Sequence, residues 1–179
     1  KMTSSINTII KYGFAKIVME EEKRYNYTGS HNYKKVELTD KQKEVASRVI
    51  NSFGTSKTFL LYGVTGSGKT EVYMNIIEKT INNGKTAIML VPEISLTPQI
   101  VGKFISRFGN IISVLHSKLS DTERYDEYRK ITEGKSKIVI GTRSAIFVPF
   151  NNIGVIIIDE EHTSSYKQEN HPRYNAKNI

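Results

Sequence analysis

One segment constrains this chain more than any other, because it combines three glycines with a lysine and a threonine at fixed spacing. The segment reads, in order, Gly63, Val64, Thr65, Gly66, Ser67, Gly68, Lys69 and Thr70. It matches the pattern G-x-x-x-x-G-K-[ST], and it lies between an apolar run at residues 58–62 and a helix-forming stretch at residues 69–82. Glycines let a backbone fold closely around phosphate oxygens, and the start of a helix adds partial positive charge. The pattern therefore predicts a strand, a phosphate-binding loop and a helix, because a plain glycine-rich turn would not need Lys-Thr.

The side chains of this loop and of a second segment suit a nucleotide with bound magnesium. We expect the ammonium group of Lys69 to reach the β- and γ-phosphates of ATP, and the hydroxyl of Thr70 to ligate Mg²⁺. An apolar run at residues 155–158 ends in Asp159 and Glu160. The carboxyl end of a parallel strand lies at the edge where ligands bind, so Asp159 is a candidate for the metal shell and Glu160 for orienting the attacking water. The alternative is an acidic turn after a core strand.

Apolar runs and helical patterns alternate along most of the chain. Besides the two runs named above, we expect strands at residues 86–91, 112–115 and 137–140. We expect helices at residues 38–53 and 69–82, and two more that begin at the capping signals of Thr97 and Ser120. Near-continuous apolar strands separated by helices predict a parallel sheet that is covered on both faces, which is an α/β fold.

The composition narrows the classes of partner. The 179 residues carry 26 basic and 18 acidic side chains, a net charge of +8, so nucleic acid is the first candidate among polyanions. Cysteine is absent, which excludes disulfides and cysteine-bound zinc within this sequence, and the four histidines lack metal-ligand spacing. No apolar run approaches the ~20 residues that cross a bilayer, and no signal-peptide core follows the start, so we expect a cytoplasmic protein without membrane contact.

Several segments resemble the motor motifs of one family of bacterial proteins. Residues 159–162, Asp-Glu-Glu-His, resemble the DExH box of superfamily 2 helicases. More closely, the similarity to the primosomal helicases, the PriA family, lies in residues 63–73, 90–97, 141–145 and 159–168. The resemblance covers residues 36–179 and implies a RecA-like P-loop NTPase lobe of an ATP-dependent 3′-to-5′ DNA helicase. It also implies forked or single-stranded DNA as substrate, the primosome proteins of replication restart as partners, and a location at the bacterial nucleoid.

The resemblance also sets expectations for domain organisation. Residues 1–25 are similar to the tail of a winged-helix DNA-binding module, residues 26–35 are turn-rich and suggest a linker, and residues 36–179 form the first motor lobe with a short N-terminal appendage. The family carries a second lobe with an arginine finger and a zinc module with cysteine ligands, and neither is in this sequence. We therefore expect the chain alone to bind nucleotide weakly, to hydrolyse it poorly and to unwind nothing.

Two groups of residues are candidates for DNA contact. In the family, the loops after two of the strands follow the DNA backbone, which implicates Ser95, Thr97, Thr142, Arg143 and Ser144. Ordinary helix capping is the alternative for these loops. The segment at residues 166–177 interleaves aromatic and basic side chains, which suits stacking on bases and neutralising phosphates. This pattern implicates Tyr166, Lys167, Arg173 and Tyr174, and the alternative is a solvated loop with incidental tyrosines.

Three further residues have two interpretations each. Gln42 resembles the helicase glutamine that reads adenine, but with Thr39 it also forms a capping-box pattern. His162 is either a sensor of the γ-phosphate or an exposed polar residue. His116 follows a predicted strand and is either functional or packed.

Two rival functions remain open at this point. One is another P-loop NTPase, such as a kinase, which would not need an aromatic and basic segment after the acidic turn. The other is a nucleotide-gated DNA-binding module without turnover. DNA structure preference and oligomeric state are not indicated by the sequence.

Overall fold

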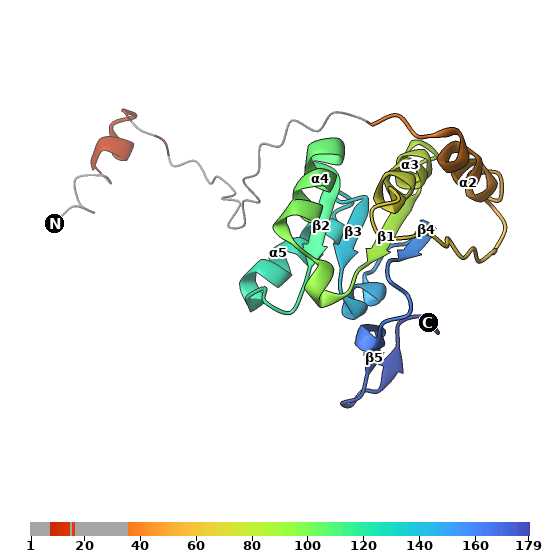
Figure 1. Ribbon diagram of the computed structural model, residues 1–179. Coiled ribbons are helices and arrows are strands. Elements are labelled where there is room, and N and C mark those ends of the chain that lie inside the picture. Colours follow the sequence, from red (N-terminus) through yellow and green to blue (C-terminus); the bar gives the residue numbers. More distant parts are fainter. Residues whose placement is uncertain (1–7, 15, 17–35) are drawn as a thin grey trace.

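A computed structural model describes residues 8–14, 16 and 36–179 of the chain. The predicted linker at residues 26–35 and most of the predicted winged-helix tail at residues 1–25 lie outside the described residues, apart from one short helical stretch at residues 8–11. Residues 36–179 form helices and strands in alternation, as the sequence predicts (Figure 1).

The centre of the fold is a parallel sheet of four strands in the order β2-β3-β1-β4. The strands are β1 (Thr86–Leu90), β2 (Ile112–Leu115), β3 (Ile138–Gly141) and β4 (Ile153–Ile158). Their register aligns Leu90 with Gly141 on one side and with Ile158 on the other, so the strands end together. This arrangement brings the loops that follow the strands to one edge of the sheet, and it confirms the predicted parallel sheet.

Helices cover both faces of the sheet, because successive residues of a strand point to opposite faces. The helices are α2 (Asp40–Ile50), α3 (Lys69–Asn82), α4 (Pro98–Phe108) and α5 (Asp121–Thr132). On one face Met89 packs in a cluster with side chains of α3 and α4, and α2 packs on the outside of α3. On the other face Ile88 and Leu90 pack with side chains of α5 and of the C-terminal segment. Strands β1, β2 and β3 are buried on both sides, as their composition predicts, whereas β4 at the edge of the sheet is only partly buried.

The helices begin where the capping signals predict. Thr39 and Ser120 each accept a hydrogen bond from the backbone three residues ahead, and Gln42 and Glu123 reach back to complete two capping boxes. Thr97 caps α4, whose first residue is proline. Each cap satisfies amide groups that the first turn of a helix leaves without partners.

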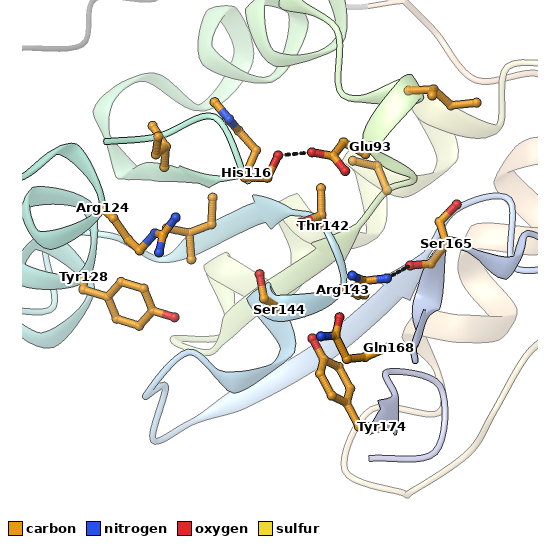
Figure 2. A pocket seen from close by; sticks show the side chains of 15 residues that line it. Glu93, His116, Arg124, Tyr128, Thr142, Arg143, Ser144, Ser165, Gln168 and Tyr174 are labelled. Atoms are coloured by element: carbon orange, nitrogen blue, oxygen red, sulfur yellow. Dashed lines mark hydrogen bonds between the residues drawn. The ribbon is translucent and has the colours of Figure 1, made fainter. Parts of the chain in front are cut away.

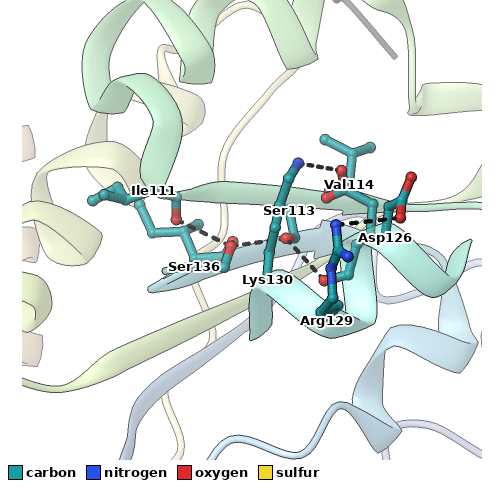
Figure 3. Close-up of polar contacts among 9 residues, drawn as sticks. Ile111, Ser113, Val114, Asp126, Arg129, Lys130 and Ser136 are labelled. Atoms are coloured by element: carbon teal, nitrogen blue, oxygen red, sulfur yellow. Dashed lines mark hydrogen bonds and ion pairs between the residues drawn. The ribbon is translucent and has the colours of Figure 1, made fainter. Parts of the chain in front are cut away.

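One backbone amide at the outer edge of β2 is satisfied by a side chain of α5 (Figure 3). The Glu127 carboxylate accepts a hydrogen bond from the Val114 amide at 3.1 Å, and the same carboxylate is held by Lys130. Beside it, the buried hydroxyl of Ser136 donates to that of Ser113 at 2.8 Å. An edge strand otherwise presents unpaired amides that recruit other strands, and Glu127 removes one of them.

The predicted strand at residues 58–62 is wrong. The segment is not paired in the sheet, and the side chains of Leu60 and Tyr62 are 77% and 93% exposed. Only Leu61 packs against the core, next to Val155 of β4. In the described part of the chain, β4 is the edge of the sheet and no strand pairs with its outer side. An apolar run becomes a strand only where a neighbour accepts its hydrogen bonds, and this run has none among the described residues.

Short elements gather at the carboxyl edge of the sheet. They are the 3-10 turns η1 (Glu93–Ser95), η3 (Arg143–Phe147) and η4 (Ser164–Tyr166), and the strands β5 (Lys167–Gln168) and β6 (Tyr174–Asn175). A further 3-10 turn, η2 (Gly109–Ile111), directly precedes β2 and so lies at the opposite edge. Strands β5 and β6 form an antiparallel ribbon, which lies beyond the carboxyl ends of the sheet strands (Figure 1). Within the described residues, no helix has the length and apolar character that crossing a membrane requires.

Candidate functional site

The glycine-rich loop leads directly into the N-terminus of α3. Gly66 and Gly68 have φ values of 80° and 79°, a left-handed conformation that glycine adopts without strain. Gly68 precedes the first helical residue, and no side chain caps this end of the helix. The Lys69 ammonium group folds back over the loop and donates to the carbonyl oxygens of Gly63 at 2.7 Å and Val64 at 3.0 Å. Uncapped helix amides and a lysine above a glycine loop form a cradle for an anion.

Gln42 contacts this loop from α2. Its Nε2 atom donates to the carbonyl of Ser67 at 2.9 Å, while its Oε1 atom accepts from the Thr39 amide at 2.9 Å. A Cβ atom added to Gly68 would lie 2.5 Å from the same Nε2 atom, so only glycine fits there without displacing the amide. The capping interpretation of Gln42 is confirmed, and its role in reading adenine stays a prediction.

The acidic turn after β4 lies beside α3. The Asp159 amide donates to Leu90 of β1 at 2.9 Å, which continues the sheet register into the turn. The Asp159 carboxylate accepts hydrogen bonds from the Tyr73 hydroxyl at 3.2 Å and the Glu160 amide at 3.1 Å. Burial, and then the charge of Asp159, raise the pKa of Tyr73, so this phenol remains a hydrogen-bond donor beyond the pH at which an ordinary tyrosine ionises. The loop helix and the acidic turn are thus joined by a direct side-chain contact.

The next residues of the turn point to solvent. Glu160 is exposed and has φ 47°, and it is the one non-glycine residue with positive φ in the described part of the chain. Glu161 and His162 are also exposed, and Lys177 holds Glu161 by donating to its carbonyl at 2.9 Å. Non-glycine residues in this conformation gather at functional sites, where the strain is maintained by surrounding contacts. The exposure of His162 fits both a sensor of the γ-phosphate and an exposed polar residue, so both interpretations stay open.

The loop and the turn fit a nucleotide with a divalent cation. Space within 4 Å of a Cβ position at Gly66 is open, and the amides at the start of α3 carry no side-chain cap. The sequence indicates two oxygen ligands for the cation, the hydroxyl of Thr70 and the carboxylate of Asp159. No group of three His, Cys, Asp or Glu side chains within the described residues could hold a metal by itself. This donor set suits Mg²⁺, which binds through one or two protein oxygens together with phosphates and water.

Tyr166 is placed differently from its predicted role. Its side chain is 1% exposed, and its hydroxyl donates to the carbonyl oxygens of Asp159 and, at 3.2 Å, of Leu90. A buried ring cannot stack on a base, so the predicted DNA contact by Tyr166 is corrected to a structural one. Tyr166 fixes the backbone of the acidic turn, because its hydroxyl binds the carbonyl of the residue whose carboxylate faces Tyr73.

Arg143 also contacts the C-terminal segment. Its Nη1 atom donates to the carbonyl of Lys167 at 2.8 Å and, more weakly, to that of Ser165 at 3.4 Å. The sequence predicts that this guanidinium binds phosphate, whereas here part of it fixes the turn that carries Tyr166. Hydrogen bonds therefore run from η3, through the segment at residues 165–167, to Asp159 and Tyr73.

A pocket of about 620 Å³ lies at the carboxyl edge of the sheet (Figure 2). Four of the nine residues predicted to contact DNA line this pocket. They are Thr142, Arg143, Ser144 and Tyr174. The other five do not line it. Thr97 caps α4, Arg173 donates to the carbonyl of Glu169 at 3.0 Å, and Lys167 pairs with the Glu169 carboxylate at 3.3 Å. Ser95 ends η1 and Tyr166 is buried.

The pocket also includes residues that the sequence analysis missed or left open. Arg124 and Tyr128 of α5 form part of its wall, and their spacing of four residues on a helix is the signal that would have indicated a shared face. His116 lines it as well, and burial, followed by the charge of Lys118, lowers the pKa of its imidazole. The His116 Nδ1 atom accepts from the Lys118 amide at 3.2 Å, as a neutral ring does.

Comparisons with known proteins agree with this geometry. A family model described as DEAD/DEAH box helicase matches residues 39–179. The replication restart protein PriA of Bacillus subtilis (strain 168) is 51% identical over 182 residues, which cover 99% of this chain and 22% of that protein. The proteins of the same name from Synechocystis and Chlamydia muridarum are 46% and 41% identical, over 98% and 99% of this chain and 21% and 24% of their own lengths.

These matches confirm the resemblance that the motifs indicate. The chain spans between a fifth and a quarter of the length of these three relatives. The family match spans the phosphate loop, the parallel sheet, the acidic turn and the pocket beyond it. The chain belongs to the DEAD/DEAH box helicase family.

Proposed function

We propose that residues 36–179 are the first motor lobe of an ATP-dependent 3′-to-5′ DNA helicase that acts in replication restart. The observation that carries the proposal is the contact between the phosphate-loop helix and the acidic turn through Tyr73 and Asp159. This contact brings the two halves of a phosphoryl-transfer site together at one edge of the sheet. The relatives support the rest of the proposal, since all three carry the name of a replication restart protein.

In this proposal the chain binds ATP at the start of α3. The loop amides and the Lys69 ammonium group bind the phosphates, with Lys69 leaving the carbonyls of Gly63 and Val64. Gln42 adjoins the same loop and reads the base. Thr70 and Asp159 would hold Mg²⁺, which when bound neutralises charge on the phosphates. Glu160 orients the water that attacks the terminal phosphate, and His162 senses that phosphate.

DNA binding is proposed at the same edge of the sheet, in the pocket beside η3. The hydroxyl groups of Thr142 and Ser144 can donate to phosphate oxygens of the DNA. The exposed parts of Lys167, Arg173 and Tyr174 border the bound DNA strand in this proposal. Arg143 contacts the segment that Tyr166 connects to Asp159. A bound DNA strand that moves Arg143 therefore shifts the acidic turn as well. This movement links DNA binding to ATP hydrolysis.

The proposal extends to partners and to the residues before the lobe. Forked or single-stranded DNA is the proposed substrate, and primosome proteins are the proposed partners at the bacterial nucleoid. Residues 1–25 are proposed to end a winged-helix module, with residues 26–35 as a linker. A second lobe that supplies an arginine finger would complete hydrolysis.

Nucleotide binding tests the proposal directly on this chain. A fluorescent ATP analogue is titrated with magnesium into the wild-type protein, Lys69→Ala, and the matched control Lys79→Ala, which removes an exposed lysine from the far end of the same helix. We expect Lys69→Ala to abolish binding and Lys79→Ala to preserve it. Equal binding by all three proteins would overturn the nucleotide site.

Hydrolysis separates the motor from its two rivals. Glu160→Gln should preserve nucleotide binding by this chain. In a longer chain that includes the remaining length of the relatives, the same change should stop DNA-stimulated hydrolysis. A kinase-like enzyme would show no stimulation by DNA, and a nucleotide-gated binding module would show no turnover in the wild type.

A further inference from the structure

Two side chains of α5 face the pocket at the carboxyl edge of the sheet. Arg124 and Tyr128 are four residues apart, so they lie on one face of the helix, and both line the pocket. Figure 2 shows them on one side of the pocket, with Arg143, Gln168 and Tyr174 on the opposite side. The hydroxyl-bearing residues Thr142 and Ser144 lie between the two sides.

The charges around α5 leave Arg124 available to an anion. The neighbouring cations Arg129 and Lys130 are paired with Asp126 and Glu127 on the same helix. Arg124 is exposed, and its guanidinium has no hydrogen bond or ion pair to any residue in the described part of the chain. The pocket is therefore cationic on its α5 side.

Glu93, the acidic residue on the opposite side of the pocket, does not neutralise the positive charge of Arg124 through an ion pair. Glu93 also lines the pocket, and its carboxylate accepts a hydrogen bond from the Ser117 hydroxyl. Glu93, the first residue of η1, is thus held by Ser117, and it makes no hydrogen bond or ion pair with Arg124.

Tyr128 supplies an aromatic face that is held in place. Its ring is half-buried and packs against the core cluster of Ile88, Leu90 and Leu119 on this face of the sheet. A ring that is fixed by the core loses little freedom when a flat ligand stacks on it. Base stacking on aromatic side chains tolerates any sequence, because every base has a π-face.

We propose that Arg124 and Tyr128 form a site for one nucleotide unit of a single DNA strand. The Arg124 guanidinium binds the phosphate, the Tyr128 ring stacks on the base, and Thr142 and Ser144 donate to the adjoining phosphate. The pocket volume of about 620 Å³ is in the range of ordinary ligand sites. This inference rests on the proposed DNA-binding function, and it extends the DNA site to α5, which the helicase motifs do not include.

Fluorescence anisotropy with a labelled oligothymidylate at several salt concentrations tests the two roles separately. Arg124→Gln should weaken binding several-fold and lower the slope of log affinity against log salt by about 0.7, the value for one phosphate contact on a single strand. Tyr128→Leu should weaken binding about fivefold or more with an unchanged salt slope, because stacking releases no counterion. Tyr128→Phe should retain more affinity than Tyr128→Leu.

A matched control and a competition complete the design. Lys103→Gln removes an exposed cation from α4, outside the pocket, and should leave both affinity and salt slope unchanged. Circular dichroism checks that each variant is folded. Inorganic phosphate and thymidine monophosphate should compete only weakly with the oligonucleotide, since a single unit lacks the adjoining phosphate.

The outcomes distinguish this inference from the proposed function. If the wild-type chain binds the oligonucleotide while Arg124→Gln and Tyr128→Leu bind as well as it does, the α5 site is wrong and the DNA-binding proposal stands. If the wild-type chain does not bind the oligonucleotide, both are overturned. If Lys103→Gln lowers affinity and salt slope as much as Arg124→Gln, general surface charge explains binding and the α5 site is overturned.

Discussion

The hydroxyl of Tyr73 donates a hydrogen bond to the carboxylate of Asp159 across 3.2 Å, although the two residues are 86 positions apart in the sequence. Tyr73 lies one turn after the phosphate loop in α3, and Asp159 is the first residue after β4. The contact fixes the position of the acidic turn relative to the loop. Any change in the loop that shifts α3 is therefore transmitted to the carboxylate.

Removing this hydroxyl should destabilise the fold measurably. Tyr73 is buried, and hydrogen bonds to charged acceptors contribute about 1.5–3 kcal/mol. We expect Tyr73→Phe to lower the free energy of unfolding by about that amount in urea denaturation. Tyr125→Phe, at a tyrosine that is 65% exposed on α5, is the control and should have no measurable effect. Equal stability of Tyr73→Phe and the wild type would show that the contact is not formed in solution.

Tyr166 should make the protein sensitive to alkaline pH. Burial, followed by the charges of Asp159 and Glu160, raises the pKa of Tyr166 above its ordinary value of 10.0. The unfolded chain therefore loses this proton near pH 10 while the folded chain keeps it, so the free energy of unfolding falls as pH rises past 10. Below that pH the contribution is fully present.

The measurement compares the pH dependence of stability in the wild type and in Tyr166→Phe. The slope between pH 9 and 11 should be less steep in Tyr166→Phe, because phenylalanine does not titrate. Identical slopes would mean that Tyr166 ionises as readily in the folded state as in the unfolded chain.

Gly68 should tolerate substitution less well than a glycine of similar backbone conformation. Gly68 and Gly84 have φ values of 79° and 72°, so alanine is strained at both. Only at Gly68 would the new Cβ atom meet another group, the Gln42 amide at 2.5 Å, whereas nothing lies within 4 Å at Gly84. We expect Gly68→Ala to cost about 1 kcal/mol more than Gly84→Ala, because displacing Gln42 also breaks the capping box of α2.

A double-mutant cycle with Gln42→Ala checks this cause by thermal or urea unfolding. In the Gln42→Ala background the two glycine substitutions should cost nearly the same. A persistent difference would assign the extra cost to the loop backbone alone.

Glu127 should be more important to stability than its place in a surface helix suggests. Its carboxylate accepts the hydrogen bond of the Val114 amide in a buried strand, and a buried amide without a partner costs about 1–3 kcal/mol. We expect Glu127→Ala to lose stability in this range, and Glu127→Gln, which keeps one acceptor oxygen, to lose less. Glu133→Ala just after the same helix removes a surface ion pair with Lys135 and should change stability by under about 1 kcal/mol.

Much of the fold could be predicted from local signals. The helix expected at residues 69–82 spans Lys69–Asn82, and the strand expected at residues 112–115 spans Ile112–Leu115. Glycines and capping side chains mark these boundaries in the sequence itself. The strand expected at residues 58–62 fails, because pairing depends on a neighbour and not on the apolar character of the segment.

The candidate site was only partly predictable, because its contacts join distant segments. Tyr166 is one of several aromatic residues in a polar stretch, and nothing local distinguishes the ring that the fold buries. The contact of Tyr73 with Asp159 requires the packing of α3 against the sheet, which residue spacing does not give. Arg124 and Tyr128 share a helix face, yet only the position of α5 beside η3 shows that this face borders a pocket.

The backbone of Glu160 implies an antagonism between stability and activity. Its φ of 47° would suit glycine, which adopts this conformation without steric cost. Glu160→Gly should therefore raise the melting temperature while it removes the carboxylate that the proposed reaction requires. Laboratory selection for thermostability alone would therefore favour glycine at position 160, and the selected protein would be more stable but catalytically inactive.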